Sequence, residues 1–347
     1  MDLTIPGILV TISYTLALFL CKVVRDAAIR RKLVDVPNAR SLHETPVPRL
    51  GGVAITLTVW SLLGLASLWS PLLWHRDVIL WFFGSVLIAG IGLLDDLKSL
   101  SAAVRFLCQI GVATAVLVAV PLATIVPLGA GWEVSFPRAM MLVLGVLFVV
   151  GTTNIYNFMD GMDGIAGVQS IGAGLALSGV TAIMGHFDLC LVALVVAGAS
   201  AGFLLHNVPP ATLFLGDAGS TFLGFTFSTI GLVAMSRPSP VPFLVVPVAL
   251  SPFLLDGTFT ILRRLSRGEP IWKAHRSHLY QRAVASGLGH REVLVVYAAW
   301  TAAASAAALL IARADARQAA VVLVAMGAAL VGVWRWVVVR ERSAAPK

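Results

Sequence analysis

Charged side chains are scarce in this 347-residue chain, at 12% of the residues against about 25% in ordinary soluble domains. Hydrophobic residues make up 58%, and the mean hydropathy is +0.91. Apolar stretches long enough to cross roughly 30 Å of hydrocarbon recur along the whole chain. The composition therefore excludes an ordinary soluble protein and predicts one integral-membrane domain over residues 1–347. In such a chain the net charge of +8 does not indicate nucleic acid as a partner.

Cysteine is also scarce, with three residues in all. Cys21, Cys108 and Cys190 lie in or beside apolar segments, and no CxxC pair or spacing with histidine indicates a metal site. We expect buried and unreactive thiols.

The apolar pattern predicts an all-α polytopic fold with about eleven transmembrane helices, the first of them retained in the mature protein. The expected spans are 3–21, 52–70, 78–94, 102–121, 139–154, 165–184, 189–205, 219–236, 241–262, 292–312 and 318–339. Three prolines, Pro242, Pro247 and Pro252, predict a kink in the ninth. Residues 122–138 combine two β-prone runs around Gly-Ala-Gly, which favours a small hairpin on the outer, periplasmic side.

Lysine and arginine predict the orientation. With the N-terminus outside and the C-terminus in the cytoplasm, twenty of the 25 basic residues fall on the cytoplasmic side. The cytoplasmic loops are then expected at about 22–51, 95–101, 155–164, 206–218 and 263–291.

Carboxylates gather on the same predicted side, at three separate loops. Their polar residues are Asp95 and Asp96; Asn154, Asn157, Asp160 and Asp163; and Asn207 and Asp217. Like charges beside an apolar region are costly unless a cation or proton neutralises them. Each Asp alone could simply cap a helix, but the group favours a hard divalent cation. Mg²⁺ suits it, because Mg²⁺ is commonly held by one or two carboxylates plus phosphate oxygens.

Glycines and basic residues add a phosphate signal. Gly161, Gly164 and Gly167 in "DGMDGIAG", like the glycines of "GDAGS", allow tight turns at helix starts, where free N–H groups suit phosphate. The loop "RRLSRGEPIWKAHRSHLYQRAV" carries His275, Arg276, His278 and Arg282. The two histidines would share one side if the stretch were helical, and phosphate binding fits them better than the alternative of zinc.

Six ordered motifs together resemble the polyprenyl-phosphate N-acetylhexosamine-1-phosphate transferases, relatives of phospho-N-acetylmuramoyl-pentapeptide transferase. They are "PNARSLHETPVPRLGG", "GLLDDLKSLSAAVRFLCQ", "NIYNFMDGMDGIAG", "NVPPATLFLGDAGS", "SPFLLDGTFTILRR" and "HRSHLYQR", between residues 37 and 282. The "HRSHLYQR" form resembles the branch that uses UDP-N-acetylaminosugars such as UDP-N-acetylglucosamine. It is unlike the three consecutive histidines of the muramoyl-pentapeptide branch.

The resemblance implies a multi-pass enzyme of the bacterial cytoplasmic (inner) membrane with its active site on the cytoplasmic face. The lipid substrate would be undecaprenyl phosphate, the cofactor Mg²⁺ or Mn²⁺, and the products UMP and a lipid diphosphate sugar for O-antigen, lipopolysaccharide or another cell-envelope glycan.

The resemblance also assigns roles to particular residues. By position, Asp217 matches the metal ligand, and Asp95, Asp96 and Asp160 match catalytic or metal-proximal positions. The nucleotide-binding positions match Asn157, Gly161, Asp163, Asn207 and Phe214. The phosphate-binding positions match His43, Arg49, Lys98, His275, Arg276, His278 and Arg282, although the lysine of "DDLK" stands one position earlier than in the muramoyl-pentapeptide branch.

Several alternatives stay open at this stage. Direct attack by the lipid phosphate is favoured over an aspartyl-phosphate intermediate, and either Asp95 or Asp96 could contact the acceptor. An ion-coupled transporter is the rival class, but transporters place their acids near the midplane, often between inverted repeats, and no repeat is present. Residue types do not determine which N-acetylated sugar is used, nor whether the protein forms a homodimer.

Overall fold

The computed structural model describes residues 4–35, 46–129, 131–270 and 276–344. The long helices are α1 (Thr4–Arg30), α2 (Gly51–Ser67), α3 (Arg76–Lys98), α4 (Ala102–Ala119), α5 (Arg138–Met159), α6 (Ile165–Ile183), α7 (Phe187–Asn207), α8 (Asp217–Met235), α10 (Ser251–Ser266), α12 (His290–Ile311) and α13 (Ala316–Ala344). The short ones are η1 (Pro71–Trp74), α9 (Val245–Ala249) and α11 (Leu279–Ala285). The protein is therefore an all-α polytopic membrane protein with two small sheets.

Nine of the described helices are long and apolar enough to cross a membrane, and α2 is a slightly shorter apolar helix. The predicted span at 241–262 is the exception, because it forms two helices, α9 and α10, that meet at Leu250. Pro252 stands in the first turn of α10, where its missing N–H costs no hydrogen bond. The proline series thus predicted the kink correctly, whereas the pattern missed the complete break.

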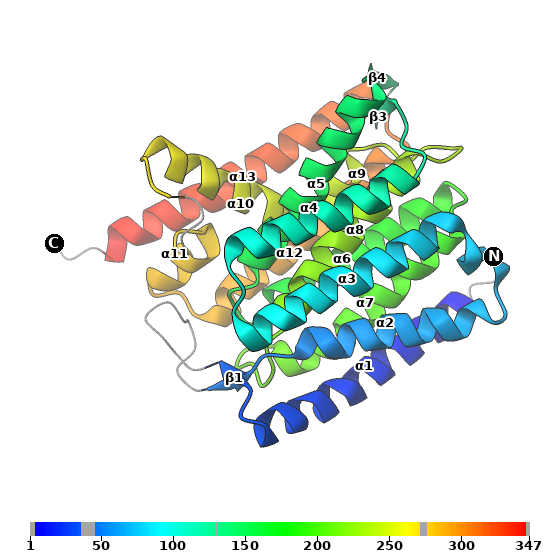
Figure 1. Cartoon of the computed structure of the whole chain (residues 1–347). Helices are drawn as coiled ribbons and strands as arrows, with labels where there is room; N and C mark the ends of the chain where they lie inside the picture. The colour runs from blue at the N-terminus through cyan, green and yellow to red at the C-terminus, as the bar shows by residue number, and fades with distance from the viewer. Residues whose placement is uncertain (1–3, 36–45, 130, 271–275, 345–347) are drawn as a thin grey trace.

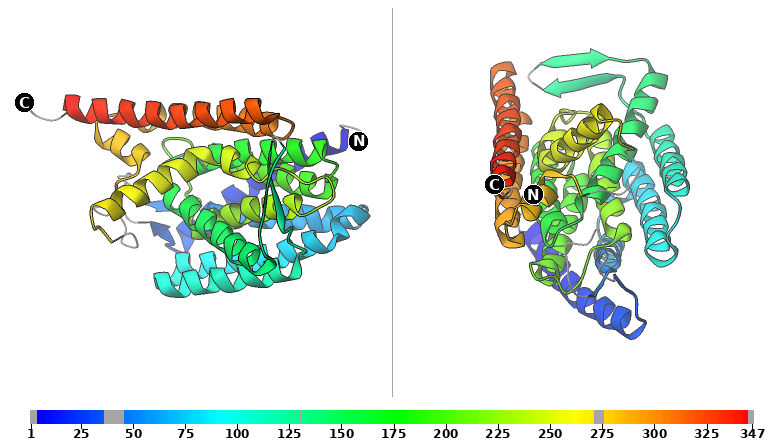
Figure 2. Two further views of the ribbon diagram at one scale, coloured as in Figure 1. Left: turned by 90° about the horizontal axis from the view of Figure 1, so that it is seen from above. Right: turned by 90° about the vertical axis from the view of Figure 1, so that its left-hand side faces the viewer.

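The bundle is built around α8 (Figure 1). Every residue of α8 after Asp217 is buried, whereas α1 and α13 lie at the periphery and bury few of their residues (Figure 2). Cys21 and Cys190 are buried as predicted, but Cys108 is exposed because it lies on the outer face of the peripheral helix α4. Small residues let the inner helices approach closely, as is typical of membrane bundles.

The two sheets mark opposite ends of the bundle (Figure 1). The hairpin of β3 (Ile125–Gly129) and β4 (Trp132–Ser135) confirms the hairpin predicted within 122–138. At the other end, β1 (Val34–Asp35) pairs with β2 (Val47–Pro48). At this second end α3, α5 and α7 extend to Lys98, Met159 and Asn207, into segments predicted as loops. The polar motifs therefore lie in last helical turns and short connections.

Candidate active site

The two aspartates at the end of α3 face different neighbours. The carboxylate of Asp95 accepts a hydrogen bond from Leu100 N at 2.6 Å and lines a small pocket. The carboxylate of Asp96, whose side chain is 1% exposed, accepts from the backbone N–H groups of Asp217 and Ala218, each at 3.0 Å. Asp96 therefore caps the N-terminus of α8 from another helix.

This cap corrects one expectation from the sequence. The first N–H groups of α8 were predicted to receive phosphate, but the Asp96 carboxylate already accepts from two of them. The contact depends on the close approach of α3 to α8, because a Cβ atom on Gly92 would overlap the backbone oxygen of Asp217. A glycine at this position therefore brings Asp95 and Asp96 up to the start of α8.

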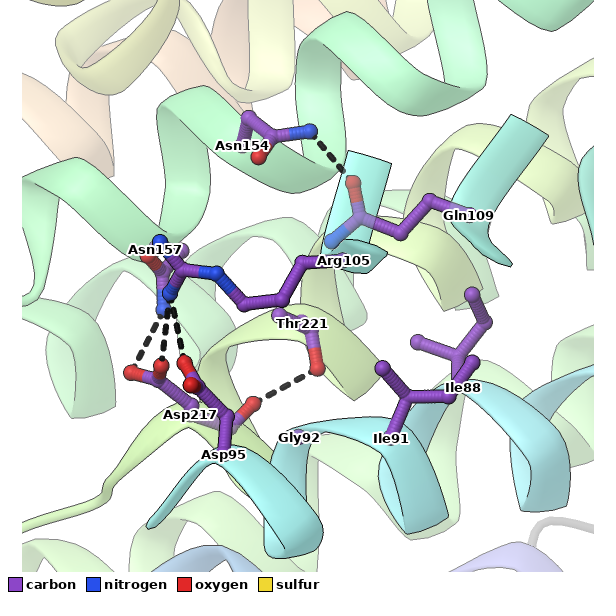
Figure 3. A pocket seen from close by; sticks show the side chains of 10 residues that line it. All are labelled: Ile88, Ile91, Gly92, Asp95, Arg105, Gln109, Asn154, Asn157, Asp217 and Thr221. Carbon is purple, nitrogen blue, oxygen red and sulfur yellow. Dashed lines mark hydrogen bonds and ion pairs between the residues drawn. The ribbon is translucent and has the colours of Figure 1, made fainter. Parts of the chain in front are cut away.

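Asp95 and Asp217 converge on one guanidinium group, that of Arg105 in α4 (Figure 3). Arg105 Nη1 lies 2.5 Å from Asp95 Oδ2 and 3.1 Å from Asp217 Oδ2. Asn157 in the last turn of α5 donates to Asp217 Oδ1 at 2.9 Å. The predicted residues Asp95, Asn157 and Asp217 thus meet in one pocket, which α3, α4, α5 and α8 line.

Arg105 and Gln109 line the pocket although neither was predicted as a site residue, and Asn154, one of the polar residues of the three loops, lines it as well. Asn154 donates to Gln109 Oε1 at 2.6 Å, which joins α5 to α4 beside the pocket. The only signal in the sequence was that Arg105 is one of two basic residues near the "DD" pair. Its pairing with Asp217, 112 positions away, depends on the packing of α4 against the bundle.

Asp160 follows α5 directly and belongs to the same acidic group. Burial, together with the negative charges of Asp217, Asp96 and Asp163, raises the pKa of Asp160 to about 8. The carboxyl group is therefore easily protonated near neutral pH unless a cation stabilises its charge.

Three predicted nucleotide-binding residues make internal contacts instead of lining the pocket. Asn207 accepts from Gly164 N at 2.9 Å and donates to Leu213 O at 3.0 Å. Asp163 Oδ2 accepts from Ala211 N at 2.9 Å. Phe214 forms a parallel bridge with Arg49. These contacts tie the α5–α6 turn, the α7–α8 connection and the β2 segment into one frame around the pocket.

Those predicted phosphate-binding residues that the structure describes are spread over the same end of the molecule. Lys98 and Arg276 are exposed, whereas Arg49 Nη2 donates to Asp96 O at 3.0 Å. Arg282 forms a two-point ion pair with Glu341 of α13, at 2.7 and 2.5 Å. His43 and His275 lie outside the described residues.

His278 does not lie on the face of a helix, as the HxxH spacing would require. It is the residue before α11, it is 2% exposed, and its Nδ1 lies 3.4 Å from Asp256 Oδ1. The two histidines were expected to share one side only if the stretch were helical, and this condition is not met at His278, because α11 begins at Leu279.

The donor set suits a divalent cation that is completed by phosphate oxygens. Two carboxylates, Asp95 and Asp217, point toward the same place, and Asn157 adds an amide. Among the described residues no group of three or more His, Cys, Asp or Glu side chains has the geometry of a metal site. Mg²⁺ commonly needs only one or two carboxylates when it binds phosphate, so the residues present fit it.

Comparison with known proteins agrees with this site. Residues 78–235 match the family described as Glycosyl transferase family 4. A probable undecaprenyl-phosphate N-acetylglucosaminyl 1-phosphate transferase of Bacillus subtilis is 34% identical over 297 residues, which cover 82% of this chain and 79% of that protein. A decaprenyl-phosphate N-acetylglucosaminephosphotransferase of Mycobacterium tuberculosis is 30% identical over 305 residues, or 80% of this chain and 75% of the relative. An undecaprenyl-phosphate alpha-N-acetylglucosaminyl 1-phosphate transferase of Escherichia coli is 25% identical over 302 residues, which cover 85% of this chain and 80% of that protein. The chain belongs to Glycosyl transferase family 4.

Proposed function

We propose that this protein transfers an N-acetylhexosamine 1-phosphate from a UDP-sugar to undecaprenyl phosphate. An oxygen of the lipid phosphate attacks the β-phosphorus of the UDP-sugar and forms a new P–O–P bond. The bond from that phosphorus to the bridging oxygen breaks, and UMP leaves with this oxygen. The relatives named above suggest N-acetylglucosamine as the sugar.

The observation that carries the proposal is the convergence of Asp95, Asp217 and Arg105 in one pocket at the ends of α3, α8 and α4. Phosphoryl transfer asks the protein mainly to position the reactants and to balance charge on the transferred group. Arg105 offers a planar cation that can hydrogen-bond phosphate oxygens as it does these carboxylates. Asn157 holds the orientation of Asp217 through Oδ1.

The structure favours Asp95 over Asp96 as the residue nearer the acceptor. Asp95 lines the pocket, whereas both carboxylate oxygens of Asp96 accept from the start of α8. The lipid phosphate, with a second pKa near 6, is largely ionised at pH 7 and needs no strong base. Asp95 would then orient the acceptor, and direct attack requires no covalent enzyme intermediate.

We propose Mg²⁺, with Mn²⁺ as a substitute, as the cofactor. When bound, it would neutralise charge on the diphosphate and act as a Lewis acid at the transferred group. Asp217 and Asp95 would hold it, with Asp160 close enough to add negative charge. The chain's own part is to hold these carboxylates at the ends of α3, α5 and α8, where α8 packs against both of the other helices.

The distribution of basic residues supports a cytoplasmic position for the end of the bundle that holds the pocket. The five that the orientation leaves outside are Arg76, Arg138, Arg237, Arg313 and Arg317, all at helix ends or connections opposite the pocket. A UDP-sugar is made in the cytoplasm, so this orientation gives it access. The product would then begin a cell-envelope polysaccharide such as O-antigen on the inner membrane of a bacterium.

The direct test is UMP release by purified protein supplied with undecaprenyl phosphate and a panel of UDP-N-acetylaminosugars. We expect UMP and lipid diphosphate sugar in equal amounts, loss of both in EDTA, and recovery with Mg²⁺ or Mn²⁺. A phosphorylated enzyme trapped with the UDP-sugar alone would replace direct attack by the aspartyl-phosphate route. Transfer that is insensitive to chelators would remove the metal from the proposal.

A further inference from the structure

The buried carboxylate of Asp256, outside the pocket, joins α10 to two other elements. Asp256 of α10 is 0% exposed, and Tyr297 of α12 donates to its Oδ2 at 2.6 Å. Leu279 N, in the first residue of α11, donates to its Oδ1 at 2.9 Å. Burying a carboxylate removes its hydration, which is costly, and hydrogen-bond donors such as these compensate for that loss. Asp256 therefore fixes where α11 begins relative to α10 and α12.

Tyr280, the next residue of α11, connects Asp256 to the pocket end of α5. Tyr280 N lies 3.4 Å from Asp256 Oδ2, and its ring stacks on His278 at 5.8 Å between centroids. The Tyr280 side chain is fully buried, and its hydroxyl donates to Phe158 O, in the last turn of α5, at 3.4 Å. Tyr280 thus spans from the Asp256 anchor to the end of the helix that precedes Asp160.

Gly161 lies against the Tyr280 side chain, and this close approach leaves no room for a larger residue. A Cβ atom at Gly161 would overlap the Tyr280 hydroxyl oxygen, while the ring carbon Cζ would lie at 3.3 Å. The backbone of Gly161 does not have a positive φ, so only this lack of space opposes alanine. The Tyr280 hydroxyl therefore rests directly on the turn that holds Asp160.

We propose that Asp256, acting through Tyr280, positions the Asp160–Gly161 turn against the acidic pocket. Asp256 and Tyr280 are positioning residues, since neither lines the pocket. The inference rests on the proposed function, because it gives these residues a part in phosphoryl transfer. It also reassigns Gly161, which the sequence suggested as a nucleotide contact, to packing against Tyr280.

The test is a double-mutant cycle of Gly161→Ala and Tyr280→Phe. Gly161→Ala should lower kcat by about 100-fold, because displacements near 1 Å cost about that much in a positioned reaction. Tyr280→Phe loses one long hydrogen bond and should cost less than about tenfold. In the double variant the new methyl group meets Cζ only at 3.3 Å, so we expect kcat at least about tenfold above that of Gly161→Ala.

The matched control is Gly151→Ala in α5, where a Cβ atom meets nothing within 4 Å. This variant should keep the wild-type rate and show no coupling to Tyr280→Phe. Asp256→Asn should lower kcat with a smaller change in KM, and Tyr280→Phe should not rescue it, because the anchor itself is then lost. Additive effects of Gly161→Ala and Tyr280→Phe in an active enzyme would overturn the inference.

Thermal unfolding of the same variants separates this inference from the proposed function. Melting temperatures of the four-variant cycle in detergent report the packing of Tyr280 on Gly161 even if no UDP-sugar is turned over. The two substitutions could have non-additive effects on the melting temperature while the wild-type protein is inactive. That result would refute the proposed function and the positioning role, and would support only the packing of Tyr280 on Gly161. An uncoupled melting temperature together with uncoupled kcat would refute the packing itself.

Discussion

The two ends of the bundle hold the same small unit, one guanidinium between two carboxylates. At the pocket end Arg105 joins Asp95 and Asp217, and at the opposite end Arg237 joins Asp77 and Asp188 at 3.1 and 2.7 Å. In the pocket unit the side chains of Arg105 and Asp217 are 31% and 30% exposed and that of Asp95 is 7% exposed, whereas all three of the opposite unit are at most 10% exposed. The units differ in accessibility and not in composition.

This difference separates a site from a structural contact. The Arg237 unit ties α3, α7 and the segment after α8 together, and all three of its side chains are largely buried. The Arg105 unit opens on a pocket with amides and lies close to further acids. Substitutions in the Arg237 unit should therefore change stability, and substitutions in the Arg105 unit should change turnover.

The largest contrast should come from Asp217→Asn and Asp188→Asn. Asp217→Asn removes the charge proposed to hold the metal and should reduce kcat by about 10³-fold or more, by analogy with the loss of one key electrostatic group. Asp188→Asn should keep kcat within a few-fold and lower the melting temperature, because it breaks a buried ion pair. Near-normal turnover of Asp217→Asn would exclude Asp217 from the reaction.

The arginines should divide in the same way. Arg105→Gln should lower kcat by about 10²-fold, since it removes the cation that we propose contacts the transferred phosphate. Arg237→Gln leaves two buried carboxylates unpaired and should cost about 3 kcal/mol or more of stability. UMP release and thermal unfolding, measured on both variants, check this, and equal effects of the two on turnover would contradict the distinction.

A finer contrast lies within the "DD" pair itself. Asp95→Asn breaks the ion pair in the pocket and should act mainly on kcat. Asp96→Asn leaves one of two N–H groups at the start of α8 without an acceptor, so it should cost about 1 kcal/mol of stability and also lower turnover by shifting Asp217. A variant Asp96→Asn with unchanged melting temperature would argue against the cap.

The smallest effect concerns pH. The pKa of Asp160 in the folded protein, about 8, lies above its ordinary value, so folding holds this proton more tightly than the unfolded chain does. The corresponding stability is present below about pH 4 and is lost as the pH rises toward 8. In EDTA, the melting temperature of Asp160→Asn should therefore fall less than that of the wild type between pH 5 and 8.

The helices could be predicted because hydrophobic length is a local property of the chain. The same pattern could not place the break at Leu250, where α9 and α10 meet and where both pack against the distant helix α12. It also ends α3 and α5 too early, because polar residues such as Asp95 and Asn157 indicate loops in an apolar pattern, although here they belong to last helical turns.

The acids of the site could be predicted from residue type and motif, but their partners could not. Asp96 appeared equivalent to Asp95 until the start of α8, 121 positions away, was seen to donate to it. Arg282 was expected to bind phosphate, yet Glu341 in the last helix pairs with it. Such partners depend on tertiary packing, which no local pattern encodes.

The most direct test of the account compares UMP release by the wild-type protein, Asp217→Asn and Asp188→Asn with UDP-N-acetylglucosamine and undecaprenyl phosphate. We predict Mg²⁺-dependent release that is retained in Asp188→Asn and lost in Asp217→Asn, although the latter remains folded. Release that survives in Asp217→Asn, or that fails in the wild type with every UDP-sugar of the panel, would contradict the account.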